Sequence, residues 1–314
     1  MVVPSYRRPV ALAQCLRGLA AQADPADEVV VVHRPDDHET IAVVDSSPVG
    51  LRTLRAVHEP GVVAAMAVGC SAVRAGVVAF CDDDAIPRPD WIAAIRAAFR
   101  HARLGALGGR DRLGPPHPVY PPTESVGLIG GWGRLTGEHH RGAGNPRGVD
   151  VLKAVNMAFR AEALAFPTGL RGEGAQVHFE LSMCLWARER GWDVVYDPEL
   201  VVDHHPQQRF DDDRRDWPTP GAISDAAYNY TLSLLTFKPV LAPRRAAYAF
   251  AVGDTAAPGL VRAALAIGRR DAMTSRKFLP SQRGMVHALV AFRRGHCVRM
   301  TPVLGLIPED TLPP

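Results

Sequence analysis

Short apolar runs of strand character alternate with amphipathic helical segments over residues 1–110. Val29–Val32 is β-branched without interruption, as expected of a strand that is covered on both faces. The same pattern places strands at 2–3, 28–32, 51–57 and 77–81, and helices around 12–19, at 62–73 and at 90–100. Chains that alternate strands and helices in this way build parallel sheets with helices on both sides. The sequence therefore predicts an α/β fold with a doubly wound, Rossmann-like, mostly parallel sheet.

The pattern changes after residue 110. Residues 111–150 are rich in Pro and Gly and lose their periodicity, which is typical of a long functional loop region. Beyond it we expect a strand at 151–155, a helix near 160–164, a helix at 180–190, short strands at 194–196 and 200–202, and helices over 222–300 with breaks at Pro239, Pro243, Pro258 and Pro280. We therefore expect a domain at residues 1–220, with halves at 1–110 and 111–220, and a helical C-terminal region at 221–314.

Charge and cysteine content narrow the class of protein. The chain has 36 Lys and Arg against 33 Asp and Glu, and this net charge of +3 gives no signature of nucleic-acid binding. None of the five cysteines belongs to a Cys-x-x-Cys pair, which favours a reducing compartment over a zinc site or a disulfide framework. Since the sequence also lacks a run of about 18 apolar residues, a membrane-spanning helix is not expected. We expect a cytoplasmic protein that does not bind nucleic acid.

Three aspartates follow directly on the expected strand at 77–81. In an open α/β sheet, ligands bind beyond the carboxyl ends of the strands. Adjacent carboxylates repel one another unless a cation is present, and Asp82 and Asp84 would share one side of an extended segment. Oxygen ligands suit Mg²⁺ or Mn²⁺. Asp82–Asp84 is therefore predicted to hold a divalent cation with a diphosphate, and the alternative is a solvated acidic turn that caps the next helix.

Three further features lie at the ends of strands or helices. The first strand runs into Pro4, Ser5 and Tyr6, where Tyr6 could stack on a nucleobase, although an ordinary strand-to-helix turn would look the same. Glu180 begins a helix, whose dipole stabilises an anion there, as it would stabilise any N-terminal acid. His204 ends a strand and would be a metal ligand if the fold brings it to the aspartates.

Taken in this order, the features resemble glycosyltransferase family 2, whose members have the GT-A fold. The resemblance covers residues 1–206 and rests on Val2–Tyr6, Phe80–Asp84 with Pro89–Ile92, Val155–Arg160, Gly172–Leu181 with Arg190–Pro198, and Val202–His204. It implies a GT-A-type sheet with a C-terminal helical extension. It also implies an inverting, metal-dependent transfer of a sugar from a nucleoside diphosphate, most often UDP, to a hydroxyl of a glycan or lipid-linked acceptor.

The resemblance further implies roles for single residues. It assigns the Mn²⁺ or Mg²⁺ to Asp82, Asp84 and His204, the donor to Pro4, Ser5, Tyr6, Asp82 and Asp83, the acceptor side to Trp132 and Asn156, and the general base to Glu180. Trp132 would stack on a sugar face, and the alternative for it is a buried anchor. Glu173, seven residues before Glu180, competes for the role of base.

The sequence departs from the family pattern in three places. His33–Asp37 stands where the family has an Asp followed by Asn or Asp, Gly and Ser, so a donor contact by Asp36 is expected from its position only. Met66 or Ala65 lies in the region where the family usually has an Arg near the donor. Phe179 and Glu180 replace a Glu-Asp pair and leave one carboxylate.

The chemistry of sugar transfer agrees with this residue set. A departing nucleoside diphosphate needs a cation, and an acceptor hydroxyl needs a positioned base. One carboxylate apart from the aspartates implies direct displacement with inversion. Two alternatives stay open. One is a nucleotidyltransferase, which the lack of a Gly-rich loop after the first strand argues against, and the other is a degenerate member that binds sugar nucleotide or glycan without turnover.

The C-terminal region has an uneven charge. Residues 261–300 hold nine basic residues and a single acid, Asp271. Met285, Ala288 and Phe292 recur at helical spacing beside Arg293. This pattern favours a helix on an anionic membrane surface, which would place the protein peripherally on the inner face of the plasma membrane. An amphipathic helix packed on the first domain would give the same pattern.

Overall fold

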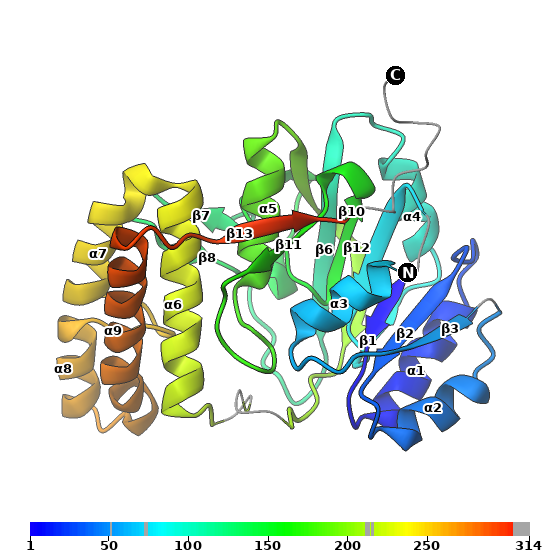
Figure 1. The fold of residues 1–314 in the computed structure, drawn as a ribbon, viewed down its shortest axis with the longest axis horizontal. Helices are drawn as coiled ribbons and strands as arrows, with labels where there is room; N and C mark the ends of the chain where they lie inside the picture. The colour runs from blue at the N-terminus through cyan, green and yellow to red at the C-terminus, as the bar shows by residue number, and fades with distance from the viewer. Residues whose placement is uncertain (51, 72–74, 211–213, 215–216, 304–314) are drawn as a thin grey trace.

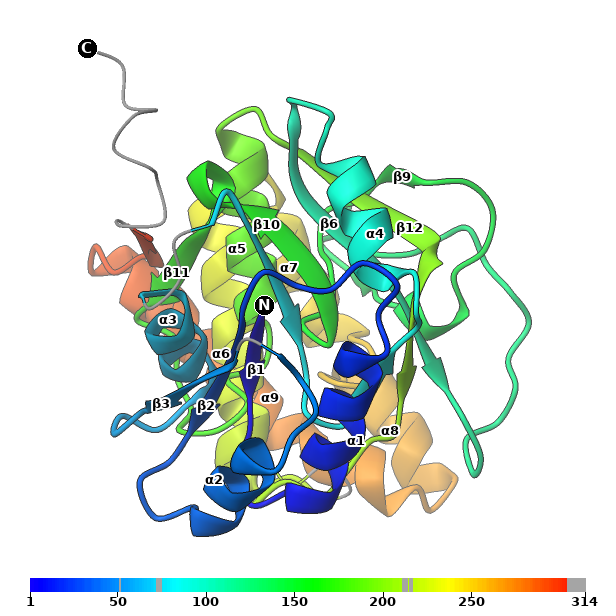
Figure 2. The ribbon, with the colours of Figure 1, turned by 90° about the vertical axis from the view of Figure 1, so that its right-hand side faces the viewer.

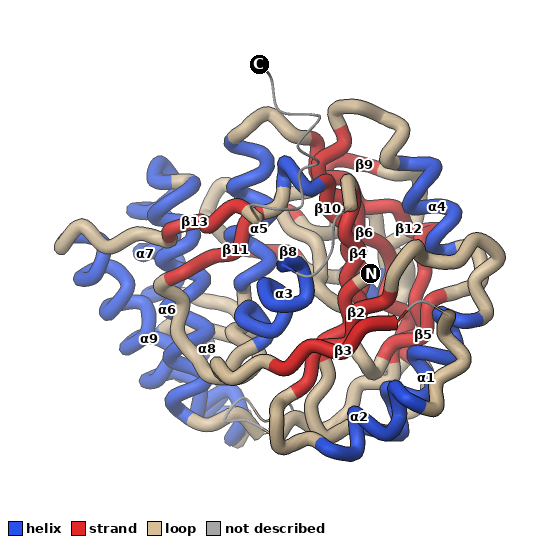
Figure 3. Tube along the Cα trace, turned by 45° about the vertical axis from the view of Figure 1, so that its right-hand side comes forward, coloured by secondary structure: helices blue, strands red, loops and turns tan. Residues whose placement is uncertain are grey.

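A nine-stranded, mostly parallel sheet forms the centre of the protein in a computed structural model, which describes residues 1–50, 52–71, 75–210, 214 and 217–303. Its main path runs β3-β2-β1-β4-β10-β6-β12-β5, with β9 paired to β12 (Figure 3). The strands are β1 (Val2–Pro4), β2 (Val29–His33), β3 (Arg52–Ala56), β4 (Val77–Cys81), β5 (Ala85–Pro87), β6 (Leu104–Leu113), β9 (Arg147–Gly148), β10 (Asn156–Arg160) and β12 (Asp193–His204). Within the path, β10 and β5 run antiparallel to their neighbours.

Helices cover both faces of this sheet, as Figures 1 and 2 show. One apolar core joins α1 (Pro9–Ala20), α2 (His38–Asp45) and α4 (Trp91–Ala98) to the first face. A second core joins α3 (Val62–Ser71) and α5 (Phe179–Glu189) to the other face. The prediction of a doubly wound α/β sheet is therefore confirmed.

The C-terminal helices gather at one end of the molecule (Figure 1). They are α6 (Pro220–Phe237), α7 (Ala242–Ala251), α8 (Leu260–Gly268) and α9 (Ala272–Arg293), with a 3-10 turn at Pro239–Leu241. Leu181 and Leu185 of α5 pack against Tyr230 and Leu234 of α6, so this region shares a core with the sheet domain. Gly284 lets α9 approach α6 closely, because a Cβ there would lie 2.0 Å from the carbonyl oxygen of Ser224.

The chain returns from these helices to the sheet domain through one more strand. β13 (Arg299–Pro302) pairs antiparallel with β11 (Ala165–Thr168), a pairing that the expectation of an all-helical C-terminal region did not include. The other short elements lie in the loop region, where β7 (Leu128–Ile129) and β8 (Leu135–Thr136) form a hairpin and His139–Arg141 is a 3-10 turn. Among the described residues, no helix combines the length and the apolar character that crossing a bilayer requires.

The largest difference from the sequence prediction is β6. No strand was predicted there, because Gly105, Gly108 and Gly109 interrupt the apolar pattern. These glycines reflect close packing, because a Cβ on Gly109 would lie 1.8 Å from the carbonyl oxygen of Leu200 on β12. A central strand can thus read as a loop when its neighbours approach its backbone closely.

Smaller corrections concern element boundaries. The strand expected at 151–155 lies at Asn156–Arg160 instead, because the apolar residues at 151, 152, 154 and 155 are buried in an irregular segment. The helix expected near 160–164 is only a 3-10 turn at Ala161–Ala163. The two strands expected at 194–196 and 200–202 are one strand, β12, with an irregularity between Asp197 and Val201.

The break expected at Pro280 does not occur. α9 continues through Pro280, since its packing on α6 outweighs the lost hydrogen bond. Positions 51, 72 and 73 of the predicted elements lie outside the described residues.

Candidate active site

The carboxyl ends of three parallel strands meet at one cavity. β1 ends at Pro4, β4 leads into Asp82, and β12 ends at His204. The cavity has a volume of about 430 Å³ and is lined by Pro4, Ser5, Tyr6, Arg8, Val32, Arg34, Val57, Gly61, Val62, Ala65, Asp82, Asp83, Lys153, Ala154, Val155, Glu173, Gly174, Ala175, Val177, Phe179, Glu180, His204, Arg209 and Phe210. The position is the one at which open α/β sheets bind ligands.

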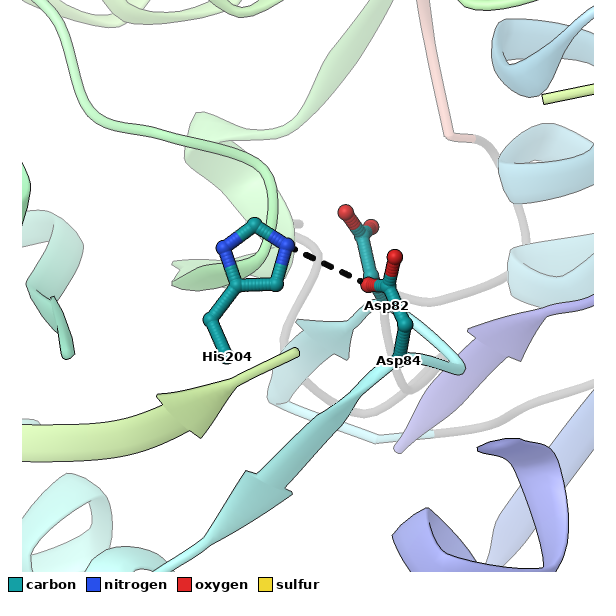
Figure 4. A group of neighbouring side chains, drawn as sticks. All are labelled: Asp82, Asp84 and His204. Atoms are coloured by element: carbon teal, nitrogen blue, oxygen red, sulfur yellow. Dashed lines mark ion pairs between the residues drawn. The ribbon is translucent and has the colours of Figure 1, made fainter. Parts of the chain in front are cut away.

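Asp82, Asp84 and His204, the three metal ligands predicted from the sequence, lie together in a group that could hold a metal ion. One ligand atom from each lies within 4.8 Å of the others, and His204 Nε2 is 3.3 Å from Asp84 Oδ1 (Figure 4). β5 sets this geometry, because its antiparallel pairing with β12 places Ala85 opposite His204 directly after the aspartate turn. The backbone N–H of Gln207 donates to Asp84 Oδ2 at 2.9 Å, which leaves Oδ1 towards the histidine.

Asp83, the middle aspartate, makes a different set of contacts. Ser5 Oγ donates to Asp83 Oδ2 at 2.7 Å, and Arg8 Nη1 donates to Asp83 Oδ1 at 2.8 Å. The same guanidinium lies 3.5 Å from Asp84 Oδ2. Burial raises the pKa of Asp83 to about 6, although Arg8 opposes the shift. Asp83 and Ser5 therefore line the cavity while they bind each other.

His204 also contacts a carboxylate that the sequence analysis did not single out. His204 Nδ1 is 3.3 Å from Asp111 Oδ2, and Asp111 forms an ion pair with Lys153. Burial alone would lower the pKa of His204, but its hydrogen bonds to Asp111 and Asp84 outweigh burial and raise it. Burial would raise the pKa of Asp111, and the nearby Lys153 instead holds it well below its usual range.

Glu180 lines the cavity from the first turn of α5. The helix begins after His178, which has a left-handed backbone with φ of 76°. Burial raises the pKa of Glu180 to about 6, which is close to the range in which a carboxylate serves as a base at neutral pH. Glu173 lines the same cavity but is exposed.

The remaining donor-side residues surround Tyr6. The Arg7 and Arg34 guanidinium carbons lie 4.9 and 5.9 Å from the centre of its ring. Asp36 does not line the cavity, and it forms a 3.0 Å ion pair with Arg7 at the surface. Its neighbour Asp37 caps α2 by accepting from the backbone N–H of Thr40. The direct donor contact expected of Asp36 is therefore not what this arrangement presents.

The two expected acceptor residues lie away from the cavity lining. Trp132 is 59% exposed in the turn between β7 and β8. Asn156 is fully buried, where its side chain accepts from Trp91 Nε1 at 2.9 Å and donates to the carbonyl oxygens of Leu200 and Arg110 at 2.8 and 3.2 Å. An amide with three partners in the core has a structural role, in place of the expected acceptor contact.

Several cavity residues were missed from the sequence. Arg8, Lys153 and Arg209 bring positive charge to the lining, and Phe210 adds an aromatic ring. Arg8 directly follows the Pro4–Arg7 turn, so its place at the end of the first strand was a usable signal. No sequence signal indicated that Lys153 would line the cavity, because its position depends on the irregular segment after the loop region.

A mostly parallel sheet with an Asp-x-Asp turn, a strand-end histidine and a carboxylate around one cavity defines the class of GT-A glycosyltransferases. A family model described as glycosyltransferase-like family 2 matches residues 1–215. The chain belongs to this family of glycosyltransferases, and the expected family and enzyme class are confirmed. This membership argues against the nucleotidyltransferase alternative.

Solved structures of similar fold agree. The mannosyltransferase PcManGT from Pyrobaculum calidifontis, in complex with GDP-Man and Mn²⁺, is 20% identical with a TM-score of 0.53, covering 92% of this chain and 85% of that one. TarS 1–349 from S. aureus, in complex with UDP-GlcNAc, is 13% identical with a TM-score of 0.57, covering 94% and 91%. These likenesses establish the fold. Among curated protein sequences, none matches this chain significantly.

Proposed function

We propose that the protein is an inverting, metal-dependent glycosyltransferase that moves a sugar from a nucleoside diphosphate sugar to a hydroxyl of a glycan or lipid-linked acceptor. UDP-sugar is the proposed donor. The observation that carries the proposal is that Asp82 and His204, which form a candidate metal group with Asp84, line the same cavity as the carboxylate Glu180. A cation site and a base are the two parts that this reaction needs.

The ligand atoms of Asp82, Asp84 and His204 suit a divalent cation. Two carboxylates and an imidazole offer the oxygen and nitrogen ligands expected for Mn²⁺, with Mg²⁺ as the alternative. When bound, such a cation offsets the charge that develops on the departing diphosphate. Arg8 and Lys153 supply two further positive charges on the cavity lining, and charge-assisted hydrogen bonds to phosphate are among the stronger ones. PcManGT is described in complex with GDP-Man and Mn²⁺, which supports the proposal that a nucleotide sugar and a divalent cation bind together here.

Other residues of the cavity lining suit a nucleobase. Tyr6 offers a ring, and Val57, Val62 and Ala65 give the lining an apolar part. Pro4 and Ser5 present the backbone at the end of β1, in reach of the same space. We retain Asp36 only as the partner of Arg7, whose guanidinium lies over the Tyr6 ring.

Glu180 would take the proton of the acceptor hydroxyl. Its raised pKa of about 6 leaves it mostly ionised at neutral pH while making it a stronger base than a solvated carboxylate. A base that activates the acceptor directly, with no separate nucleophile, gives inversion at the anomeric carbon. Trp132, an exposed aromatic on the neighbouring hairpin, is the proposed contact for a more distant sugar of the acceptor.

We also propose that the helical region attaches the protein to the cytoplasmic face of an anionic membrane. Met285 and Ala288 support this less than the sequence suggested, because both are buried and Ala288 packs with Tyr228 and Leu232 of α6. The support comes from the outer face of α8, where four large apolar side chains are exposed beside basic residues: Leu260, Val261, Leu265 and Ile267 next to Arg269 and Arg270. Apolar residues flanked by basic ones are typical of helices that lie in a membrane interface.

A thermal-shift panel tests the proposed donor class. The protein is heated with UDP, GDP, dTDP or CDP, each with Mn²⁺ and with EDTA, because a ligand that binds the folded state raises the melting temperature. We expect the largest shift for UDP with Mn²⁺. A panel in which no nucleotide shifts the transition, in Mn²⁺ or in EDTA, would contradict a sugar-nucleotide function. Binding without transfer to any acceptor would favour the degenerate member.

A further inference from the structure

The imidazole of His204 lies between two buried carboxylates from different strands. Nε2 faces Asp84 Oδ1 and Nδ1 faces Asp111 Oδ2, each at 3.3 Å. The side chains of both aspartates are 0% exposed, and that of His204 is 4% exposed. A neutral imidazole has one nitrogen that donates and one that accepts, and only the second can ligate a cation. The contact at Nδ1 therefore bears on what Nε2 can do.

Asp111 is held on the far side of the ring from the metal-binding group. It lies on β6, whose parallel register with β12 sets Asp111 opposite Val202, two residues before His204. Its other contact is the ion pair with Lys153. Lys153 and His204 line the cavity, whereas Asp111 does not. Among the contacts of the described residues, the imidazole of His204 is the link between Asp111 and Asp84 of the candidate cation site.

We infer that Asp111 is a positioning residue, which fixes the His204 tautomer and ring orientation so that Nε2 presents its lone pair to the site formed with Asp82 and Asp84. Asp111 Oδ2 accepts the Nδ1–H bond, and an ionised carboxylate is an acceptor only, so it enforces this direction. Lys153 forms an ion pair with the same carboxylate oxygen and so helps to hold Asp111 in place. Carboxylates that accept from a ligating histidine are known to tune metal affinity. This inference rests on the proposed metal site.

A purely structural role for the Asp111–Lys153 pair is the competing account. A buried ion pair whose partner is removed leaves an uncompensated charge, and that alone could destabilise the fold. The two accounts differ in one observable, which is whether the imidazole nitrogen is coordinated to a bound cation. That observable does not depend on activity.

Asp203 supplies a matched control. It is adjacent to His204 on β12, and its carboxylate accepts from Arg112 Nε of β6 at 2.6 Å. Asp203→Asn therefore removes an ion-paired carboxylate between the same two strands without touching the imidazole. A change shared by Asp111→Asn and Asp203→Asn would come from the strand pair in general.

The test measures Mn²⁺ with UDP on the full chain. Electron spin-echo modulation detects the nitrogen coupling of a ligating imidazole, and titration gives the Mn²⁺ affinity. We expect coupling in the unmodified protein and in Asp203→Asn, none in His204→Ala, and loss of coupling with a roughly 10- to 100-fold weaker Mn²⁺ affinity in Asp111→Asn. Unchanged coupling and affinity in Asp111→Asn would overturn the inference. Coupling absent from the unmodified protein would instead refute the proposed role of His204 itself, and the inference with it.

A second measurement covers the case in which Asp111→Asn does not fold. In the unmodified protein with Mg²⁺ and UDP, nitrogen NMR of labelled histidines, assigned with His204→Ala, reports which ring nitrogen carries the proton. We expect the proton on Nδ1. A proton on Nε2 would overturn the inference without any substitution at Asp111.

Discussion

Ser5 Oγ donates a 2.7 Å hydrogen bond to Asp83 Oδ2 and so ties the end of β1 to the turn after β4. The other oxygen of Asp83 accepts from Arg8, whose guanidinium also lies 3.5 Å from Asp84 Oδ2. Asp82 and Asp84 are left to face His204. The aspartates lie in a turn, in which the backbone N–H of Ala85 donates to the carbonyl oxygen of Asp82 at 3.1 Å, and not in the extended segment that the sequence analysis assumed.

The first prediction concerns cation dependence. Asp84→Ala should abolish the effect of Mn²⁺ on UDP binding, because it removes one of the three clustered ligands. Asp83→Asn should keep that effect, since Asp83 binds Ser5 and Arg8 instead. Calorimetric titration of UDP in Mn²⁺ and in EDTA measures both variants. Equal UDP affinity in Mn²⁺ and in EDTA for the unmodified protein would show that the metal assignment is wrong.

The second prediction concerns the pH dependence of transfer. The pKa of Glu180 is raised to about 6 by burial, and a general base acts only when deprotonated, so kcat should rise with pH through about 6 and level off above it. Burial raises the pKa of Asp83 to about 6 as well, which makes Asp83→Asn the necessary control. We expect this variant to retain the acid limb of the kcat profile. Disappearance of the limb in Asp83→Asn would move the titration from Glu180 to Asp83.

The third prediction separates the donor and acceptor ends. Tyr6→Ala should weaken UDP binding by about 1–3 kcal/mol, the usual value for loss of a stacked aromatic ring. Trp132→Ala should leave UDP binding unchanged and raise KM for the acceptor only, because Trp132 lies outside the cavity lining. Equilibrium UDP binding and acceptor kinetics on the two variants test both statements. A loss of UDP affinity in Trp132→Ala would contradict the assignment of the hairpin to the acceptor.

The fourth prediction concerns membrane attachment. Sedimentation with anionic vesicles should fall sharply as salt rises, since each basic residue near the surface contributes about 1 kcal/mol that salt screens. Ile267→Asp, in a residue 69% exposed on α8, should weaken vesicle binding. Val10→Asp, in a residue 73% exposed on α1, is the matched control and should not. Equal sedimentation with neutral and anionic vesicles, or none with either, would sink the membrane proposal.

Most of the sheet and the candidate cation group could be predicted from the sequence, because both depend on short-range patterns. A β-branched run such as Val29–Val32 has few alternatives to a buried strand, and three adjacent aspartates at a strand end call for a counter-charge. His204 was found through its place in the ordered set of motifs. Its distance from Asp84 follows from the pairing of β5 with β12, which no local pattern encodes.

The residues that the sequence did not reveal depend on tertiary packing. Asp111 lies on β6, whose glycines are required by close packing but interrupt the apolar pattern by which a strand is recognised. Asn156 looked like a polar residue at a binding edge, but its amide satisfies Trp91 and two backbone carbonyls in the core. Met285 and Ala288 of the predicted apolar stripe are buried, whereas Phe292 of the same stripe is exposed, and α8 adds an exposed apolar face that the pattern did not indicate.

The rate of sugar transfer by Glu180→Gln, measured beside donor affinity in the same preparation, tests the central claim most directly. Glu180 is a cavity carboxylate with a raised pKa, and loss of a general base costs roughly 10²–10⁴-fold in rate. With a UDP-sugar that the unmodified protein transfers, we expect Glu180→Gln to bind the donor nearly as well and to lose that factor in kcat. Glu173→Gln, the matched change in the exposed carboxylate of the same cavity, should lower kcat only slightly. A slow Glu173→Gln beside an active Glu180→Gln would assign the base to Glu173 and contradict the account.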